Sequence, residues 1–128
     1  MLNLRSNNKE GIFIFDILNL NYVNHDDNIV KLSPERIKTQ GDTKVREIQH
    51  SVLDNKGILT SYTTFYTQKE SGRLKASNII ATLQLYTAKE LQEMLSRNGF
   101  KVLGQYGIDG SKFSEQKTER ILTVARKQ

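Results

Sequence analysis

The sequence predicts an α+β fold with an antiparallel β meander and one main helix, and three observations support this prediction. The chain has 128 residues, 37% of them hydrophobic, which suffices for a single domain over residues 1–128 with a modest core. Three segments between residues 44 and 86 are strand-like and separated by polar turns. Residues 88–97 carry the start and stop signals of a helix at their two ends.

Composition excludes several classes of protein. The chain has no cysteine, which excludes a disulfide scaffold, a thiol nucleophile and a thiolate metal site. No apolar run approaches the roughly 20 residues that a membrane-spanning helix needs, and residues 1–8 are not a secretory signal. We therefore expect a soluble, cytoplasmic protein without a membrane partner.

The first strong element is residues 11–18, a continuous apolar run that is β-branched and aromatic. Such a run predicts a strand covered on both faces, as in the interior of a parallel sheet. Only ten residues precede it, too few to supply the other strand–helix units of a parallel sheet. An Asn- and Asp-rich stretch over residues 18–34 predicts turns, and the segment 33–36 is expected to open a short helical turn.

The middle of the chain predicts the meander. Its strands are expected over residues 44–53, 58–66 and 73–86. The helix over 88–97 follows, because Thr87 and Glu90 form a capping box before a one-sided apolar stripe, and the pair Asn98 and Gly99 ends it.

The last two strands are expected over residues 101–106 and 120–126, joined by a polar loop. The segment 86–100 reads Tyr-Thr-x-x-Glu-Leu-x-x-Met-Leu-x-x-x-Gly-Phe, and residues 120–127 end in Ala-Arg-Lys. Together with residues 11–19, which look like a fifth strand, this order resembles the C-terminal half of a class I S-adenosylmethionine-dependent methyltransferase. The resemblance implies a partial Rossmann-like methyltransferase sheet. It also implies a lid-like β insertion over residues 29–85, with the helix and closing hairpin in residues 86–128.

The family's glycine-rich cofactor loop has no counterpart, because the eight glycines are dispersed among turns. The resemblance therefore implies that the cofactor, S-adenosyl-L-methionine, is bound by an N-terminal half that acts in cis or in trans. Residues 1–10 would be the tail of a preceding helix. The isolated chain is expected to be inactive and to hold no cofactor-binding residues.

The strand over residues 12–17 should pair on one side with residues 120–126 and leave its other edge exposed. An unpaired apolar edge is commonly covered by association, so we expect a homodimer through this edge.

Candidate substrate-binding residues follow from the rule that open α/β sheets bind ligands at the carboxyl ends of parallel strands. This rule selects Asp16, Asn19 and Tyr22. An alternative is that Asp16 caps a turn and Asn19 is a plain loop residue.

The aromatic residues Tyr62, Tyr66 and Tyr86 are expected to clamp an apolar or cationic acceptor, although strand aromatics are more often ordinary core. Tyr106 joins them. The resemblance implies that the loop with Asp109, Gly110 and Ser111 faces the active site, and a plain surface loop is the equal alternative. His25 and His50 are the only imidazoles and the only candidates for a catalytic base, although surface or packing roles suit them better. No metal site is expected, because contiguous ligands such as His25 and its neighbours form a poor cage.

Methyl transfer from a sulfonium needs a protein that positions donor and acceptor and excludes water. The sequence therefore predicts the acceptor-binding portion of a methyltransferase that acts on a small molecule. The alternative from another class is a non-enzymatic binding or assembly module. A basic nucleic-acid-binding domain is a third reading, because the net charge of +5 lies in residues 51–128, but the cations there are scattered.

Overall fold

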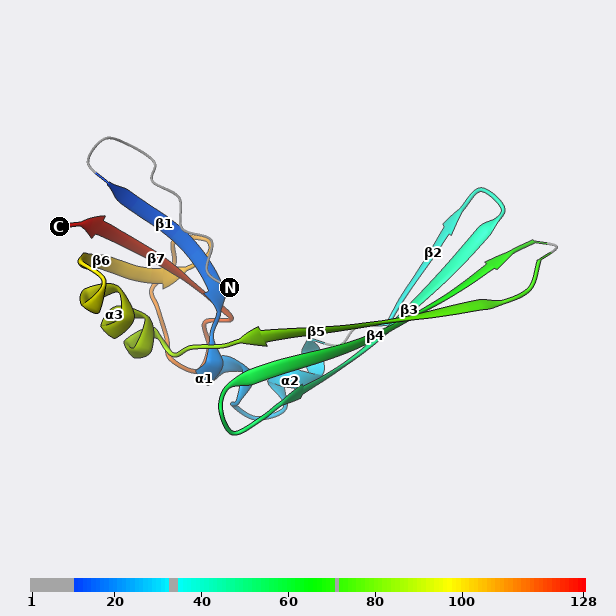
Figure 1. The fold of residues 1–128 in the computed structure, drawn as a ribbon, viewed down its shortest axis with the longest axis horizontal. Helices are drawn as coiled ribbons and strands as arrows, with labels where there is room; N and C mark the ends of the chain where they lie inside the picture. Colours follow the sequence, from blue (N-terminus) through cyan, green and yellow to red (C-terminus); the bar gives the residue numbers. More distant parts are fainter. Residues whose placement is uncertain (1–10, 33–34, 71) are drawn as a thin grey trace. The chain divides into compact units, whose positions relative to one another are not determined.

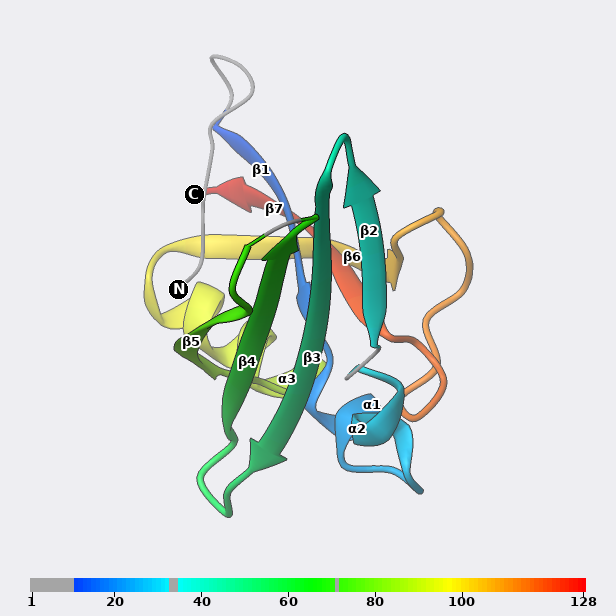
Figure 2. The ribbon, with the colours of Figure 1, turned by 90° about the vertical axis from the view of Figure 1, so that its right-hand side faces the viewer.

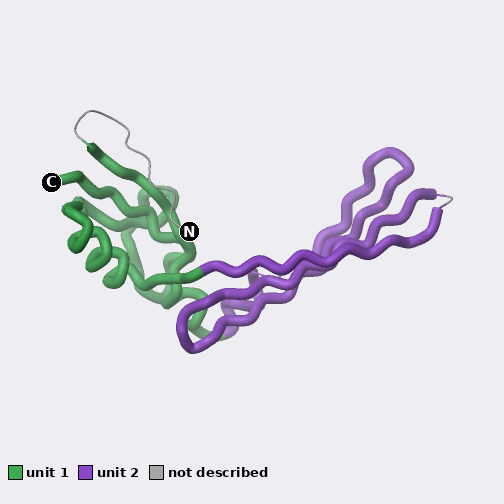
Figure 3. The backbone as a smooth tube through the Cα atoms, viewed as in Figure 1, with its two compact units in different colours: residues 1–26, 84–128 green, residues 27–83 purple. Residues whose placement is uncertain are grey.

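A computed structural model describes residues 11–32, 35–70 and 72–128. The chain forms two compact units, which Figure 3 colours separately: unit 1 comprises residues 1–26 and 84–128, and unit 2 comprises residues 27–83. The expectations for residues 1–10, and for the first two positions of the predicted helical turn, lie outside the described residues.

Unit 1 contains a three-stranded sheet in the order β1-β7-β6 (Figure 1). The strands are β1 (Ile12–Leu18), β6 (Phe100–Gly107) and β7 (Arg120–Lys127). β7 runs antiparallel to both neighbours, so β1 and β6 are parallel to each other. The predicted pairing of the first and last strands is confirmed, since Ile12 lies opposite Arg126. A four-residue helix, α1 (Leu20–Val23), follows β1.

The helix α3 (Ala88–Arg97) has the predicted bounds and covers one face of this sheet. Its N-terminus is the predicted capping box, in which Thr87 Oγ1 accepts a hydrogen bond from the amide of Glu90. Gly99 ends it with a positive φ of 83°, which a residue with a side chain adopts only at a cost. The core of unit 1 consists of the buried side chains Phe15, Ile17, Ala88, Leu91, Leu95, Ile121 and Ala125.

The opposite face of β1 is open, which corrects the prediction of a strand covered on both faces. Ile14 is 45% exposed and Asp16 is exposed as well, whereas Phe15 and Ile17 are buried towards α3. The continuous apolar run of β1 is typical of a strand that is covered on both faces. Within the described residues, only the face towards α3 is covered.

Unit 2 contains a four-stranded antiparallel sheet in the order β2-β3-β4-β5. Its strands are β2 (Arg36–Gln40), β3 (Thr43–Leu53), β4 (Ile58–Lys69) and β5 (Lys75–Gln84). A short helix, α2 (Asn28–Lys31), contacts β3. Figure 2 shows β2, β3 and β4 side by side.

The predicted three-stranded meander is present, but a fourth strand was missed. Arg36, expected in a helical turn, begins β2 and lies opposite Glu47 of β3. The hairpin between them turns at Gly41, whose φ is +61°. Every residue of β2 is exposed, so no apolar periodicity marks it in the sequence.

The fold is thus a mixed one, with two sheets and few helices. Within residues 11–32, 35–70 and 72–128, no helix has the length and apolar character required to span a membrane.

Candidate functional site

The carboxyl end of β1 is organised around Asn19, whose side chain is completely buried. Its Nδ2 donates hydrogen bonds to the carbonyl oxygens of Glu115, at 2.8 Å, and Thr118, at 2.9 Å. Its Oδ1 accepts from the amide of Asn21 at 3.1 Å and so caps α1. One amide therefore holds the loop before β7 against the end of β1, a role that the sequence did not indicate.

Two of the predicted tyrosines contact the chain at Asn19 through their backbone atoms. Tyr86 forms an isolated parallel bridge with Asn19, and its carbonyl oxygen accepts from the amide of Leu20 at 3.1 Å. The amide of Tyr22 donates to the carbonyl oxygen of Asn19 at 3.1 Å. The structure thus brings Asn19, Tyr22 and Tyr86 together at the end of β1, with both tyrosines half-buried.

Asp16 and Tyr106 lie on the open face of the sheet. Both residues are paired in register with Leu122 of β7, so their side chains leave the sheet on the same side. Asp16 Oδ1 is 2.6 Å from Nε of Arg120, and both side chains are partly exposed. Arg120 was not among the predicted site residues, although the expected pairing of the two strands would have placed it near Asp16.

The ring of Tyr106 lies back over Gly104 of the same strand. A Cβ built on Gly104 would come within 2.6 Å of Cζ of Tyr106. The pairing of β6 with β7 is irregular between Val102 and Gly104. Glycine at position 104 therefore fixes where the phenol sits, 40% exposed on the open face.

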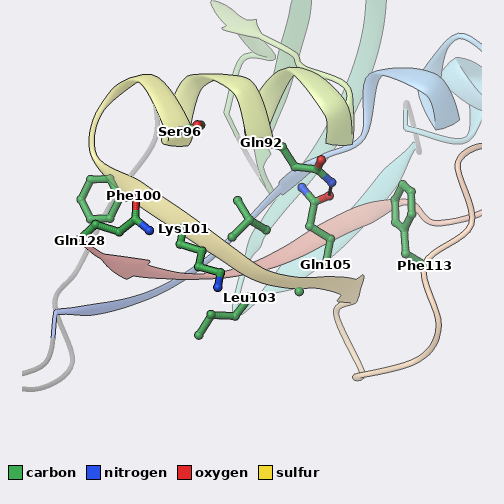
Figure 4. Close-up of a pocket in the computed structure, with 10 residues that line it drawn as sticks. Gln92, Ser96, Phe100, Lys101, Leu103, Gln105, Phe113 and Gln128 are labelled. Atoms are coloured by element: carbon green, nitrogen blue, oxygen red, sulfur yellow. Dashed lines mark hydrogen bonds between the residues drawn. The ribbon is translucent and has the colours of Figure 1, made fainter.

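A cavity of about 710 Å³ lies beside α3 and β6 of unit 1 (Figure 4). Residues of α3, β6 and the following loop line it, among them Gln92 and Phe113. Gln92 Nε2 donates to Oε1 of Gln105 at 2.6 Å, and Gln105 Nε2 donates to the carbonyl oxygen of Ala88 at 3.1 Å. None of the predicted site residues lines this cavity, so it does not belong to the site at the end of β1.

In unit 2, the candidate residues share one face of the sheet. His50 and Tyr62 lie opposite each other, and their rings are stacked with centroids 6.2 Å apart. Tyr66 lies opposite Arg46, whose guanidinium is 2.6 Å from a carboxylate oxygen of Glu35. A cavity of about 380 Å³ on this face is lined by Lys44, Arg46, Ile48, Tyr66, Gln68 and Leu74.

His25 lies apart from these groups. Its Nε2 is 3.3 Å from Oδ2 of Asp26, and its side chain is 39% exposed. In the described part of the chain, no group of three or more His, Cys, Asp or Glu residues is placed to hold a metal ion.

The loop after β6 turns at Gly107 to Ser111. Hydrogen bonds from Ser111 to the Asp109 carboxylate lower the pKa of that carboxyl group. One of them is donated by the amide of Ser111 at 3.0 Å. The sequence left two readings of this loop open, a loop that faces the site and a plain surface loop, and in the structure it is an exposed, internally bonded turn.

The described residues do not fit a complete S-adenosylmethionine site. Such a site uses a glycine-rich loop between a strand and a helix, where several amides approach the cofactor. The glycines with positive φ occur here singly, at turns or at the ends of elements: Gly11, Gly41, Gly57, Gly99 and Gly110.

Similarity to known proteins is found among solved structures. No protein-family model and no curated protein sequence matches the chain. A structure of an S-adenosylmethionine-dependent methyltransferase from Clostridium acetobutylicum matches with a TM-score of 0.66 and 17% identity, over 91% of this chain and 44% of that one. A methyltransferase from Streptomyces caelestis matches with a TM-score of 0.60 and 14% identity, over 94% and 45%. An amino pentose methyltransferase from Micromonospora echinaspora matches with a TM-score of 0.57 and 11% identity, over 74% and 36%.

At these identities the likeness shows the fold alone. The chain spans less than half the length of each of these three structures. Its two sheets and few helices therefore have the fold of part of an S-adenosylmethionine-dependent methyltransferase.

Proposed function

We propose that this chain is the C-terminal, acceptor-binding portion of a methyltransferase that transfers a methyl group from S-adenosylmethionine to a small molecule. The observation that carries the proposal is the sheet order β1-β7-β6, in which an antiparallel strand lies between two parallel ones. It contains the pairing of the first strand with the last that the family resemblance predicts. It occurs together with a methyltransferase-like fold over less than half of each neighbour. In the described chain, β1 has an open face, and beyond the Asn19–Tyr86 bridge its outer edge carries no strand, as is expected of a partial sheet of this kind.

In unit 1, the exposure of each side chain decides which role it has in the proposed acceptor site. In unit 1, Asp16, Tyr86 and Tyr106 are the proposed acceptor contacts, since each exposes at least part of its side chain near the end or the open face of β1. Asn19 supports them from inside, because its polar groups are engaged with the protein.

Unit 2 is proposed to be the lid-like insertion. Its contribution is the face that carries His50, Tyr62 and Tyr66, where aromatic rings supply apolar surface next to the cationic Arg46. His50 is the better placed of the two imidazoles to act as a base, because it lies among the proposed contacts whereas His25 pairs with Asp26.

S-adenosylmethionine supplies the methyl group in such an enzyme, and the described residues do not form its site. Calorimetric titration of the isolated chain with the cofactor is therefore expected to show no binding in the micromolar range. Micromolar affinity would contradict the division of labour proposed here.

The second experiment separates an enzyme fragment from an assembly module. A glycine-rich strand–loop–helix encoded within about 130 codons upstream of Met1 is expected, from the usual size of such domains. Co-expression with that upstream segment should yield methyl transfer, measured as formation of S-adenosylhomocysteine. An upstream region that encodes no such segment would favour the assembly module.

A further inference from the structure

The sheet of unit 2 has two outer strands, β2 and β5, and they differ in chemistry. β2 has five residues, of which Arg36 and Lys38 are basic. β5 has ten residues and a single charged one, Lys75. Its central residues Ile79 and Ile80 are 55% and 66% exposed and lie on opposite faces of the strand.

An outer strand presents a row of unpaired N–H and C=O groups that can pair with another chain. Natural proteins protect such strands by making them short or by placing charges on them, as in β2. In the described chain, β5 has no strand on its outer side and lacks both protections. The structure therefore assigns the outer edge of β5 as a pairing surface.

We infer that two copies of this chain pair antiparallel through their β5 strands, which joins two four-stranded sheets into one. A second copy is the occupant that the side-chain pattern of β5 favours. When two copies of β5 pair antiparallel about the centre of the strand, the two Lys75 side chains do not lie opposite each other. When β2 pairs with itself about its centre, the two Lys38 side chains lie directly opposite each other, which is destabilising.

The two-fold axis of such a dimer is perpendicular to the sheet, so each residue must face one on the same side of the partner strand. Two central registers satisfy this condition. The register centred on Ile80 places Ile79 opposite the partner's Ala81, and Asn78 opposite the partner's Thr82. The register centred on Ile79 places Ile80 opposite the partner's Asn78. Over its central residues 78–82, the first register pairs apolar with apolar and polar with polar side chains, so it is the one that we infer.

The inferred dimer contact lies on β5 and not, as expected from the sequence, on the edge of β1. The outer side of β1 is already occupied at its carboxyl end by Tyr86, which pairs there in parallel. The inference does not depend on the proposed function, because β5 pairing would serve an assembly module equally well.

The absence of cysteine makes the register testable by single-cysteine variants of the full chain. With Ile80→Cys, the two thiols face each other across a Cα separation of about 4.5–5.5 Å, within disulfide reach. With Ile79→Cys, the two copies are diagonal neighbours about 7–8 Å apart, and with Ser77→Cys they are farther apart still. Under mild oxidation, a covalent dimer is expected for Ile80→Cys only.

Sedimentation equilibrium tests the contact without cross-linking. The unmodified chain is expected to dimerise at tens of micromolar. Ile80→Lys should raise the dimer dissociation constant about tenfold or more, because it opposes two lysines. Ile37→Lys on β2 is the matched control, since Ile37 is 59% exposed on the other outer strand, and it should leave the constant unchanged.

Three results would overturn the inference. They are a chain that stays monomeric at about 100 µM, a dimer that survives Ile80→Lys but is lost with Ile14→Lys on β1, and cross-linking through Ile79→Cys rather than Ile80→Cys. Circular dichroism of each variant confirms that the exposed substitutions leave the fold intact.

Discussion

Replacing Asn19 with aspartate separates the donor and acceptor roles of its buried amide. The carboxylate keeps an oxygen that accepts from Asn21 and caps α1, as the amide does. It has no N–H to donate to the carbonyl oxygens of Glu115 and Thr118, and its negative charge would lie next to both. Asn19→Asp is therefore a test of the two donated hydrogen bonds.

The expected loss of stability follows from those two contacts. A buried polar group left without a partner costs about 1–3 kcal/mol, and two are created here, in addition to a buried charge. We expect Asn19→Asp to lower the free energy of unfolding by about 3–5 kcal/mol at pH 7. Burial raises the pKa of the new carboxyl group above its unfolded value of about 3.9. Its penalty is thus largest at neutral pH and shrinks as the pH falls towards about 4, where the protonated acid can donate one hydrogen bond.

Urea unfolding, followed by circular dichroism at several pH values, measures this difference against the unmodified chain. Hydrogen exchange of the amides in residues 115–119 reports the same loss locally, because the loop is no longer held to β1. Asn24→Asp is the matched control, since Asn24 is an exposed asparagine at the end of the same short helix. Equal unfolding midpoints for Asn19→Asp and Asn24→Asp would refute the role given to Asn19.

Three further predictions concern unit 1. Gly104→Ala should force the ring of Tyr106 away from its place over the strand, because the new Cβ would lie within 2.6 Å of Cζ; NMR shifts of the tyrosine ring measure this, and an unchanged ring would contradict it. Thr87→Ala should lower the free energy of unfolding by about 1 kcal/mol, because it removes the N-cap of α3. Faster amide exchange in the first turn of α3 measures this loss. The pKa of the Asp109 carboxyl group should lie below the ordinary value for an aspartate, so its contribution to stability is present at higher pH and lost as pH falls through the lowered pKa. Ser111→Ala should raise that pKa in a carboxyl NMR titration, and no change would contradict the assigned cause.

The elements that the sequence predicted well depend on local chemistry. The bounds of α3 follow from Thr87 with Glu90 at one end and Gly99 at the other, all within the element or next to it. The pairing of β1 with β7 was predicted from the family resemblance, and the register bears it out.

The features that were missed depend on distant partners or on no pattern at all. β2 has no buried residue, so only its pairing with β3 defines it. The hydrogen-bond partners of Asn19 lie 96 and 99 positions away, which no local motif reveals. The apolar run of β1 was correctly identified as a strand, but the prediction that both of its faces are covered was wrong, because Ile14 and Asp16 are exposed.

Unit 2 lies in the sequence between the two segments of unit 1, and this order has a consequence for synthesis on the ribosome. Among the described residues, the strand partner of β1 is β7, so within this chain Ile12 enters the sheet only after Arg126 has been synthesised. At about 5–20 residues per second, that delay amounts to roughly 6–23 s. Unit 2 is continuous in sequence and can fold during this interval, while the apolar β1 is held in the nascent polypeptide. A chaperone that binds extended apolar segments would therefore find its main target in residues 12–18.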